Sequence, residues 1–161
     1  MPLTTWLTLS SISYSWKLYR ELGLSRVYFS AYQRGAGSPK LPGERSSVTN
    51  SDILTREHRL YQTDWLIRKY GFKADEIPLD SSGNLSLALD PKAMWAKAHP
   101  EFFPVNVNRA DYFALLRVPG LGQVAGERIL DLRRSGVRLR SITDLGRQTK
   151  LLKKAQNYLT F

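Results

Sequence analysis

The most informative stretch of the chain is Val118-Pro119-Gly120-Leu121-Gly122, which precedes the apolar-periodic run Val124-Ala125-Gly126-Glu127-Arg128-Ile129-Leu130. Pro119 has no backbone N–H and cannot continue a preceding helix. Gly120 and Gly122 permit positive φ angles and the close approach of another backbone. Leu121 lies between the two glycines, and its side chain is long enough to pack between two helices. The pattern therefore predicts a tight hairpin that joins two short helices.

The second helix of this hairpin is expected to begin just after Gly122. The first N–H groups of a helix have no partner within the helix, and the helix dipole makes that end positive. Such an end, left at the surface, is suited to bind a phosphate group. The alternative is that the glycines only make a tight interhelical turn, as they would in a hairpin that docks another protein.

The positive charge of the chain is concentrated around the same hairpin. Residues 1–55 carry a net charge of +3, residues 56–105 are neutral, and residues 106–161 carry +7. A basic segment of this kind is typical of polyanion binding. Our candidate polyanion-binding residues are those of the turn and the basic side chains that flank it: Pro119, Gly120, Leu121, Gly122, Gln123, Arg128, Arg133, Arg134, Arg138, Arg140, Lys150, Lys153 and Lys154. Any single basic residue among them could instead be a solvated surface residue.

The pattern of apolar residues predicts a mainly α fold with a small α/β piece at the N-terminus. We expect helices over residues 11–22, 51–70 and 91–98, a strand over 26–32, a loop over 33–50 and a short strand around 85–89. We divide the chain into a βα unit with its loop (1–50), a helical connecting region (51–104) and a hairpin domain (105–161).

Four short helices are expected in the hairpin domain, the first starting at Asn108 and the last covering 149–159. Ser141 and Asp144 have the spacing of a capping box. The turn Leu145-Gly146-Arg147 indicates a degenerate second hairpin that lacks the double glycine. The residues expected to face inward are Tyr112, Phe113, Leu116, Val118, Ala125, Ile129, Leu132, Leu151, Leu152, Ala155 and Leu159.

Composition excludes several classes of site. The chain has no cysteine, so it forms no disulfide, has no thiolate nucleophile and offers no cysteine ligand to zinc or an iron–sulfur cluster. Its two histidines, His58 and His99, leave a metal site dependent on carboxylates, and none of these cluster in the sequence; we expect no metal. Residues 1–16 lack the basic start and cleavage site of a signal peptide, and no stretch is long enough to span a membrane, so we expect a cytoplasmic protein without membrane contact.

The aromatic and histidine side chains in the middle of the chain are expected to have structural roles. We expect Trp65, Tyr70 and Trp95 to belong to the core, because a base-stacking platform would need exposed rings. His58 lies near Arg56, Arg59 and Tyr61 in the sequence. A buried, hydrogen-bonded histidine, or one at an interface with another domain, is the expected reading.

The hairpin is similar to the helix-hairpin-helix motif, and the chain from about residue 16 resembles the C-terminal part of a bacterial family of radical-SAM proteins of DNA modification or repair. The matching segments are 18–24 (LYRELGL), 26–32 (RVYFSAY), 56–62 (REHRLYQ), 64–66 (DWL), 70–72 (YGF), 83–85 (GNL), 90–92 (DPK) and 107–111 (VNRAD), followed by the hairpin. In that family a barrel with a three-cysteine loop comes first, and the hairpin region is a nucleic-acid handle.

The resemblance implies a noncatalytic, non-sequence-specific DNA-binding module that contacts the phosphate backbone. The iron–sulfur cluster and S-adenosylmethionine are expected only in the family's N-terminal part, so this chain should hold no cofactor and should not be an enzyme by itself. A radical-SAM barrel is the second expected partner. The alternative is a structural domain that packs on such a barrel without touching nucleic acid. A DNA glycosylase, which needs a catalytic aspartate such as Asp144, is a third class that the surrounding pattern and the chain length do not favour.

Overall fold

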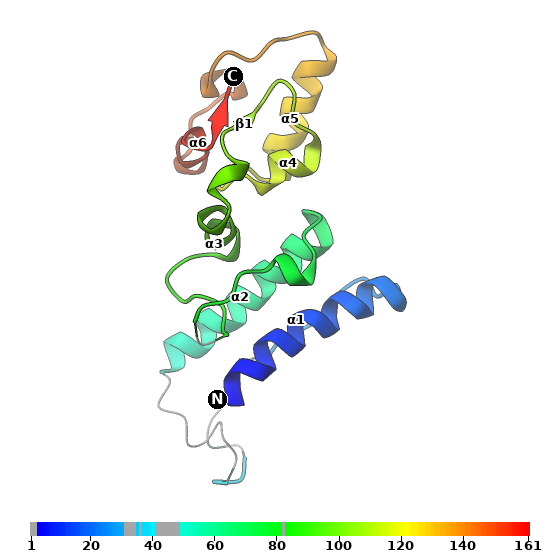
Figure 1. Ribbon diagram of the computed structural model, residues 1–161, viewed down its shortest axis with the longest axis vertical. Helices are drawn as coiled ribbons and strands as arrows, with labels where there is room; N and C mark the ends of the chain where they lie inside the picture. Colours follow the sequence, from blue (N-terminus) through cyan, green and yellow to red (C-terminus); the bar gives the residue numbers. More distant parts are fainter. Residues whose placement is uncertain (1–2, 31–34, 36, 41–48, 82) are drawn as a thin grey trace. The chain divides into compact units, whose positions relative to one another are not determined.

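The computed structural model describes residues 3–30, 35, 37–40, 49–81 and 83–161. The chain divides into two compact units, an N-terminal unit (1–94) and a C-terminal unit (95–161). The mainly α fold class is confirmed (Figure 1). The region expected at 51–104 is shared between the two units, and the predicted hairpin domain lies within the second. No helix of the described residues combines the length and apolarity needed to cross a membrane.

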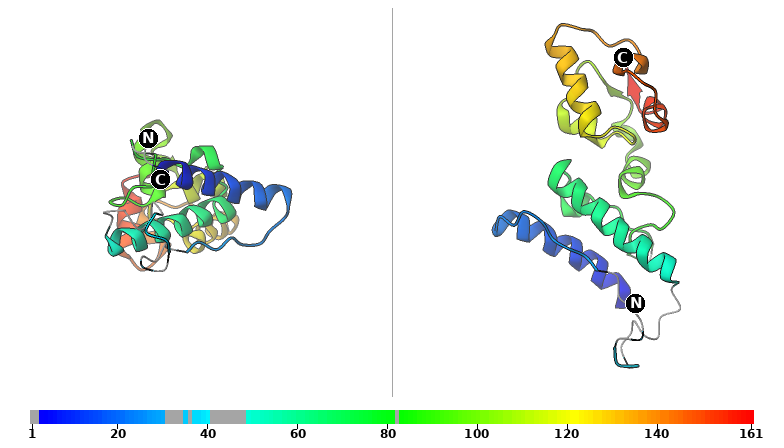
Figure 2. Two further views of the ribbon diagram at one scale, coloured as in Figure 1. Left: turned by 90° about the horizontal axis from the view of Figure 1, so that it is seen from below. Right: turned by 180° about the vertical axis from the view of Figure 1, so that it is seen from behind.

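Two long helices, α1 (Leu3–Glu21) and α2 (Asn50–Lys69), form the N-terminal unit together with the 3-10 helix η1 (Ala74–Glu76) and the start of α3 (Pro91–Ala98). Figures 1 and 2 show α1 and α2 side by side and running in the same direction. The α1 helix begins well before the predicted residue 11. The α2 helix begins at Asn50, one residue before the predicted start, and its N-cap is Thr49, whose hydroxyl accepts the Asp52 N–H at 3.1 Å.

A buried ionic group joins the two helices. The Asp64 residue is only 2% exposed. Its carboxylate accepts the Tyr19 hydroxyl and two N–H groups of Arg68, at 2.7 and 2.9 Å. Asp64 thereby raises the pKa of Arg68. Burial and the bond to Asp64 raise the pKa of Tyr19 to about 12. A buried carboxylate is costly unless it is paired in this way, so the group fixes how α1 packs on α2.

This pairing predicts a loss of stability at high pH. The folded chain favours the neutral Tyr19 phenol, so its contribution to the free energy of unfolding is complete below the ordinary pKa of 10.0 and disappears as pH rises through about 12. Urea unfolding measured from pH 8 to 12 should therefore show a steeper fall in the wild type than in Tyr19→Phe, which cannot ionise at this position. If the free energies of unfolding of the two proteins fall in parallel with pH, the raised pKa of Tyr19 is contradicted.

The strand predicted for 26–32 is not formed at residues 26–30; residues 31 and 32 lie outside the described part. The main-chain groups that a strand would offer to a neighbour are used by side chains instead. The Val27 N–H donates to the Tyr19 hydroxyl at 2.9 Å, and the Tyr61 hydroxyl bonds both the N–H and the carbonyl of Phe29. No strand forms at 85–89 either, where Arg59 donates to the carbonyls of Ser86 and Leu87. Most of the predicted loop at 33–50 lies outside the described residues.

The C-terminal unit contains α4 (Tyr112–Arg117), α5 (Gln123–Arg134) and α6 (Lys150–Gln156), with 3-10 helices η2 (Pro100–Phe102) and η3 (Ile142–Leu145). Strands β1 (Val105–Asn106) and β2 (Leu159–Thr160) pair in parallel and bring the two ends of the unit together. The core is aliphatic and consists of Val105, Val107, Leu115, Val118, Leu121, Ile129, Leu139, Ile142, Leu145, Leu152, Ala155 and Leu159.

Some predictions of local structure in this unit were wrong. The N-cap of α4 is Asp111, whose carboxylate accepts the Ala114 N–H at 2.8 Å. Asn108, predicted as the helix start, instead exchanges two hydrogen bonds with the main chain of Leu139. Phe113 and Leu151, predicted to face inward, are 53% and 63% exposed. The last helix ends at Gln156, and Leu159 belongs to β2.

Candidate nucleic-acid interface

The predicted hairpin is present between α4 and α5, and its first glycine has a packing role. Leu121 is 2% exposed, as expected for a side chain between two helices, and its N–H donates to the Val118 carbonyl at 3.1 Å. Gly120 has a φ of +92°, and a Cβ there would lie 2.2 Å from the Leu151 carbonyl oxygen of α6. The close approach that requires Gly120 is therefore made by α6.

The second glycine leaves the start of α5 open. Gly122 is the N-cap, and no side chain of the described residues caps the helix there. Its φ of −109° is extended, so the positive φ considered for it is not used. The first intrahelical bond is from the Gly126 N–H to the Gly122 carbonyl at 2.9 Å. The N–H groups of residues 123–125 come before that bond, and we call them the α5 amide site.

The α5 amide site lies at the surface. Val124, in the middle of it, is 81% exposed, and Gln123 and Ala125 are partly exposed. Three uncapped donors at the positive end of a twelve-residue helix can bind an anion.

The second hairpin, η3–Gly146–α6, also has a glycine with a positive φ, but the start of its helix is capped. Gly146 has a φ of +98°, and a Cβ there would lie 3.2 Å from Nη2 of Arg128 on α5. Each hairpin glycine thus packs against the second helix of the other hairpin. The start of α6 is capped, because the Thr149 hydroxyl accepts the Leu152 N–H at 3.2 Å.

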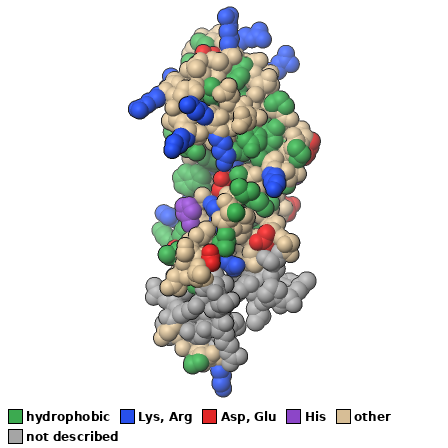
Figure 3. Space-filling model, turned by 90° about the vertical axis from the view of Figure 1, so that its left-hand side faces the viewer, with side chains coloured by type: hydrophobic (Ala, Val, Ile, Leu, Met, Phe, Trp, Pro, Cys, Tyr) green, Lys and Arg blue, Asp and Glu red, His purple; other side chains and the backbone are tan. Residues whose placement is uncertain are grey.

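The candidate basic side chains fall into two groups. Arg133 donates to the Ala110 carbonyl at 2.5 Å, and Arg134 forms an ion pair with Asp131 at 3.0 Å, so both have internal partners. The Arg134 side chain is nevertheless 75% exposed. The other candidates are also exposed: Arg128, Arg138, Arg140, Lys150, Lys153 and Lys154. Figure 3 shows Lys and Arg side chains projecting from much of the C-terminal unit on one face, with few acidic side chains between them.

Two exposed cations of the basic segment 106–161 were missing from the predicted set. Arg109 and Arg147 lie in turns, and both are exposed. The sequence could have identified both residues, because they belong to the basic segment 106–161. A third residue, Arg117, is not a surface cation: its guanidinium lies 4.7 Å from the ring centroid of the buried Trp95.

Asp144 has a structural role. Its carboxylate accepts the main-chain N–H groups of Arg140 and Ser141, at 2.7 and 3.1 Å, which lower its pKa. The predicted capping box with Ser141 is confirmed. The residue considered as a glycosylase acid is therefore engaged in capping η3.

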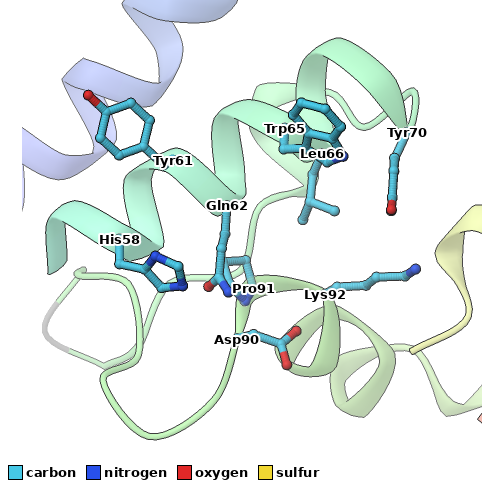
Figure 4. Close-up of a pocket in the computed structure, with 9 residues that line it drawn as sticks. All are labelled: His58, Tyr61, Gln62, Trp65, Leu66, Tyr70, Asp90, Pro91 and Lys92. Carbon is cyan, nitrogen blue, oxygen red and sulfur yellow. The ribbon is translucent and has the colours of Figure 1, made fainter. Parts of the chain in front are cut away.

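A pocket of about 370 Å³ lies in the N-terminal unit, between α2 and residues 90–92 (Figure 4). His58 at its edge is exposed, so the expectation of a buried histidine was wrong. Trp95 is buried as predicted, but Trp65, which lines the pocket, is 43% exposed. Across the described residues, no three His, Asp or Glu side chains are grouped as metal ligands.

No family model, curated protein or solved structure matches the chain.

Proposed function

We propose that the C-terminal unit is a helix-hairpin-helix module that binds duplex DNA through its phosphate backbone. The observation that carries this proposal is the α5 amide site, which has no side-chain cap among the described residues and belongs to residues that are at least partly exposed. Exposed Arg and Lys side chains in the same unit supply the positive charge that holds neighbouring phosphates. Main-chain N–H groups and flexible cations do not distinguish bases, so the binding should have no sequence preference.

The proposal includes a noncatalytic role. The chain has no cysteine, so any radical-SAM chemistry would be carried out by a partner domain that supplies the cluster, with this chain as its nucleic-acid handle. The competing function is a domain that docks on such a partner without touching nucleic acid.

Fluorescence anisotropy with two unrelated duplexes of equal length tests the proposal. Both duplexes should bind with the same affinity at low salt. The logarithm of the binding constant should fall linearly with the logarithm of salt concentration, with a slope of roughly −0.9 for each phosphate neutralised. Absence of binding at low salt would favour the docking function.

Charge reversal on α6 gives a further prediction. The double variant Lys153→Glu, Lys154→Glu should bind both duplexes about tenfold more weakly. Its salt dependence should have a shallower slope, by the amount that corresponds to roughly two neutralised phosphates. The matched control is Lys17→Glu with Lys40→Glu, the same change at two exposed lysines of the N-terminal unit. The control should bind both duplexes more tightly than the α6 variant does. A loss that differs between the two duplexes would contradict backbone recognition.

A further inference from the structure

The pocket of the N-terminal unit has a flat apolar end and a polar end. Figure 4 shows Trp65, Tyr70 and Lys92 toward one end, His58 toward the other, and Gln62 and Asp90 between them. Leu66 and Pro91 complete the apolar wall. The volume of about 370 Å³ is at the lower end of the range of about 300–1,000 Å³ that small-molecule sites occupy.

The two aromatic rings are held in place by cations. The guanidinium carbon of Arg68 lies 5.7 Å from the Trp65 ring centroid, and Arg68 is itself fixed by the buried Asp64. The Lys92 ammonium lies 4.7 Å from the Tyr70 ring centroid. An indole that is 43% exposed yet held by an ordered neighbour offers a preformed face for stacking.

The polar end presents hydrogen-bonding groups. The Gln62 Oε1 accepts from Arg59 at 2.8 Å, and no partner for the Gln62 amide nitrogen or the His58 ring is found within the described part of the chain. Asp90 Oδ1 accepts the Ala93 N–H at 2.8 Å, which holds its carboxylate at the edge of the pocket. An amide, an imidazole and a carboxylate together offer both donors and acceptors.

We propose that this pocket binds the base of an unpaired nucleotide, a deepening that rests on the proposed DNA-binding function. A nucleobase is a planar ring with donors and acceptors on its edge, which matches stacking surfaces at one end and polar groups at the other. Trp65 supplies the stacking, Tyr70 lines the same end of the pocket, and Gln62 contacts the edge of the base. Lys92, which lines the pocket, contributes positive charge near the attached phosphate.

The test uses the full chain and a short single-stranded oligonucleotide that carries one 2-aminopurine. Stacking of the 2-aminopurine on Trp65 should quench the 2-aminopurine fluorescence. The same strand with an abasic site in place of the 2-aminopurine should bind about tenfold more weakly. Trp65→Ala should also weaken binding about tenfold and remove the quenching, whereas Trp65→Phe should retain most of both. The matched control is Tyr14→Ala, which removes another exposed aromatic ring, 68% exposed, and should change neither.

Duplex binding, measured in parallel, separates the two proposals. Trp65→Ala should leave duplex affinity unchanged, because the α5 amide site is intact. If the wild type binds duplex but binds the abasic strand as well as the complete one, or if Trp65→Ala binds the single strand like the wild type, the pocket proposal is overturned and the proposed function stands. Binding of the single strand, with quenching, in a protein that does not bind duplex would overturn the duplex-binding function alone.

Discussion

Replacement of Gly120 by alanine is expected to lower the midpoint of thermal unfolding of the C-terminal unit by roughly 12 °C or more. The added Cβ would lie 2.2 Å from the Leu151 carbonyl oxygen and 3.1 Å from the Ala155 nitrogen. Both are main-chain atoms of α6, so the helix itself must move. The φ of +92° adds conformational strain of about 1–3 kcal/mol. A total of about 3 kcal/mol corresponds to the expected shift, at about 4–8 °C per kcal/mol in a unit of this size.

Gly136→Ala is the matched control for this experiment. Gly136 also has a positive φ, +77°, but a Cβ there would meet nothing within 4 Å. It should therefore show only the conformational cost, about 1 kcal/mol and a correspondingly small shift. Circular dichroism or calorimetry on both variants gives the comparison. Equal shifts of the unfolding midpoint in the two variants would mean that α6 is not in close contact with Gly120.

Gly122→Asp is expected to weaken duplex binding by about 10- to 100-fold without destabilising the fold. The φ of −109° and ψ of −179° at Gly122 suit any residue, and aspartate is a preferred N-cap. Its carboxylate would accept N–H groups of the α5 amide site and repel a phosphate. Loss of a charge-assisted contact costs about 1.5–3 kcal/mol, which corresponds to this change in affinity.

Gly122→Asn separates charge from shape. Asparagine has the same size as aspartate and is an equally good N-cap, but it is neutral. Its duplex affinity should lie between those of the wild type and Gly122→Asp in the same anisotropy titration. If Gly122→Asp keeps wild-type affinity and a normal midpoint of unfolding, phosphates bind elsewhere on the chain.

The hairpin could be predicted because its determinants are local. Pro119 and the glycines around Leu121 act on the main chain within a few residues, and the structure has α4 and α5 on either side of them. The face of α4 was harder to predict. A helix of six residues has less than two turns, so Leu115 could replace Phe113 in the core without a visible change in periodicity.

Long-range contacts explain most of what the sequence did not reveal. Nothing near Gly120 in the sequence indicates that α6 packs on it, and nothing near Arg133 indicates the bond to the Ala110 carbonyl. The segment at 26–30 has the composition of a strand. Its hydrogen bonds are taken by Tyr19 and Tyr61, which come from two different helices.

The reciprocal packing of the two hairpin glycines has a consequence for folding. The main chain of α6 lies against Gly120 and the Arg128 side chain of α5 lies against Gly146, while β1 and β2 join the ends of the same unit. Neither helical pair has its neighbours when it is alone, so the whole segment should gain its structure in one cooperative transition. An excised peptide that contains only α4 and α5 should consequently be unstructured in solution, however well its sequence encodes the turn.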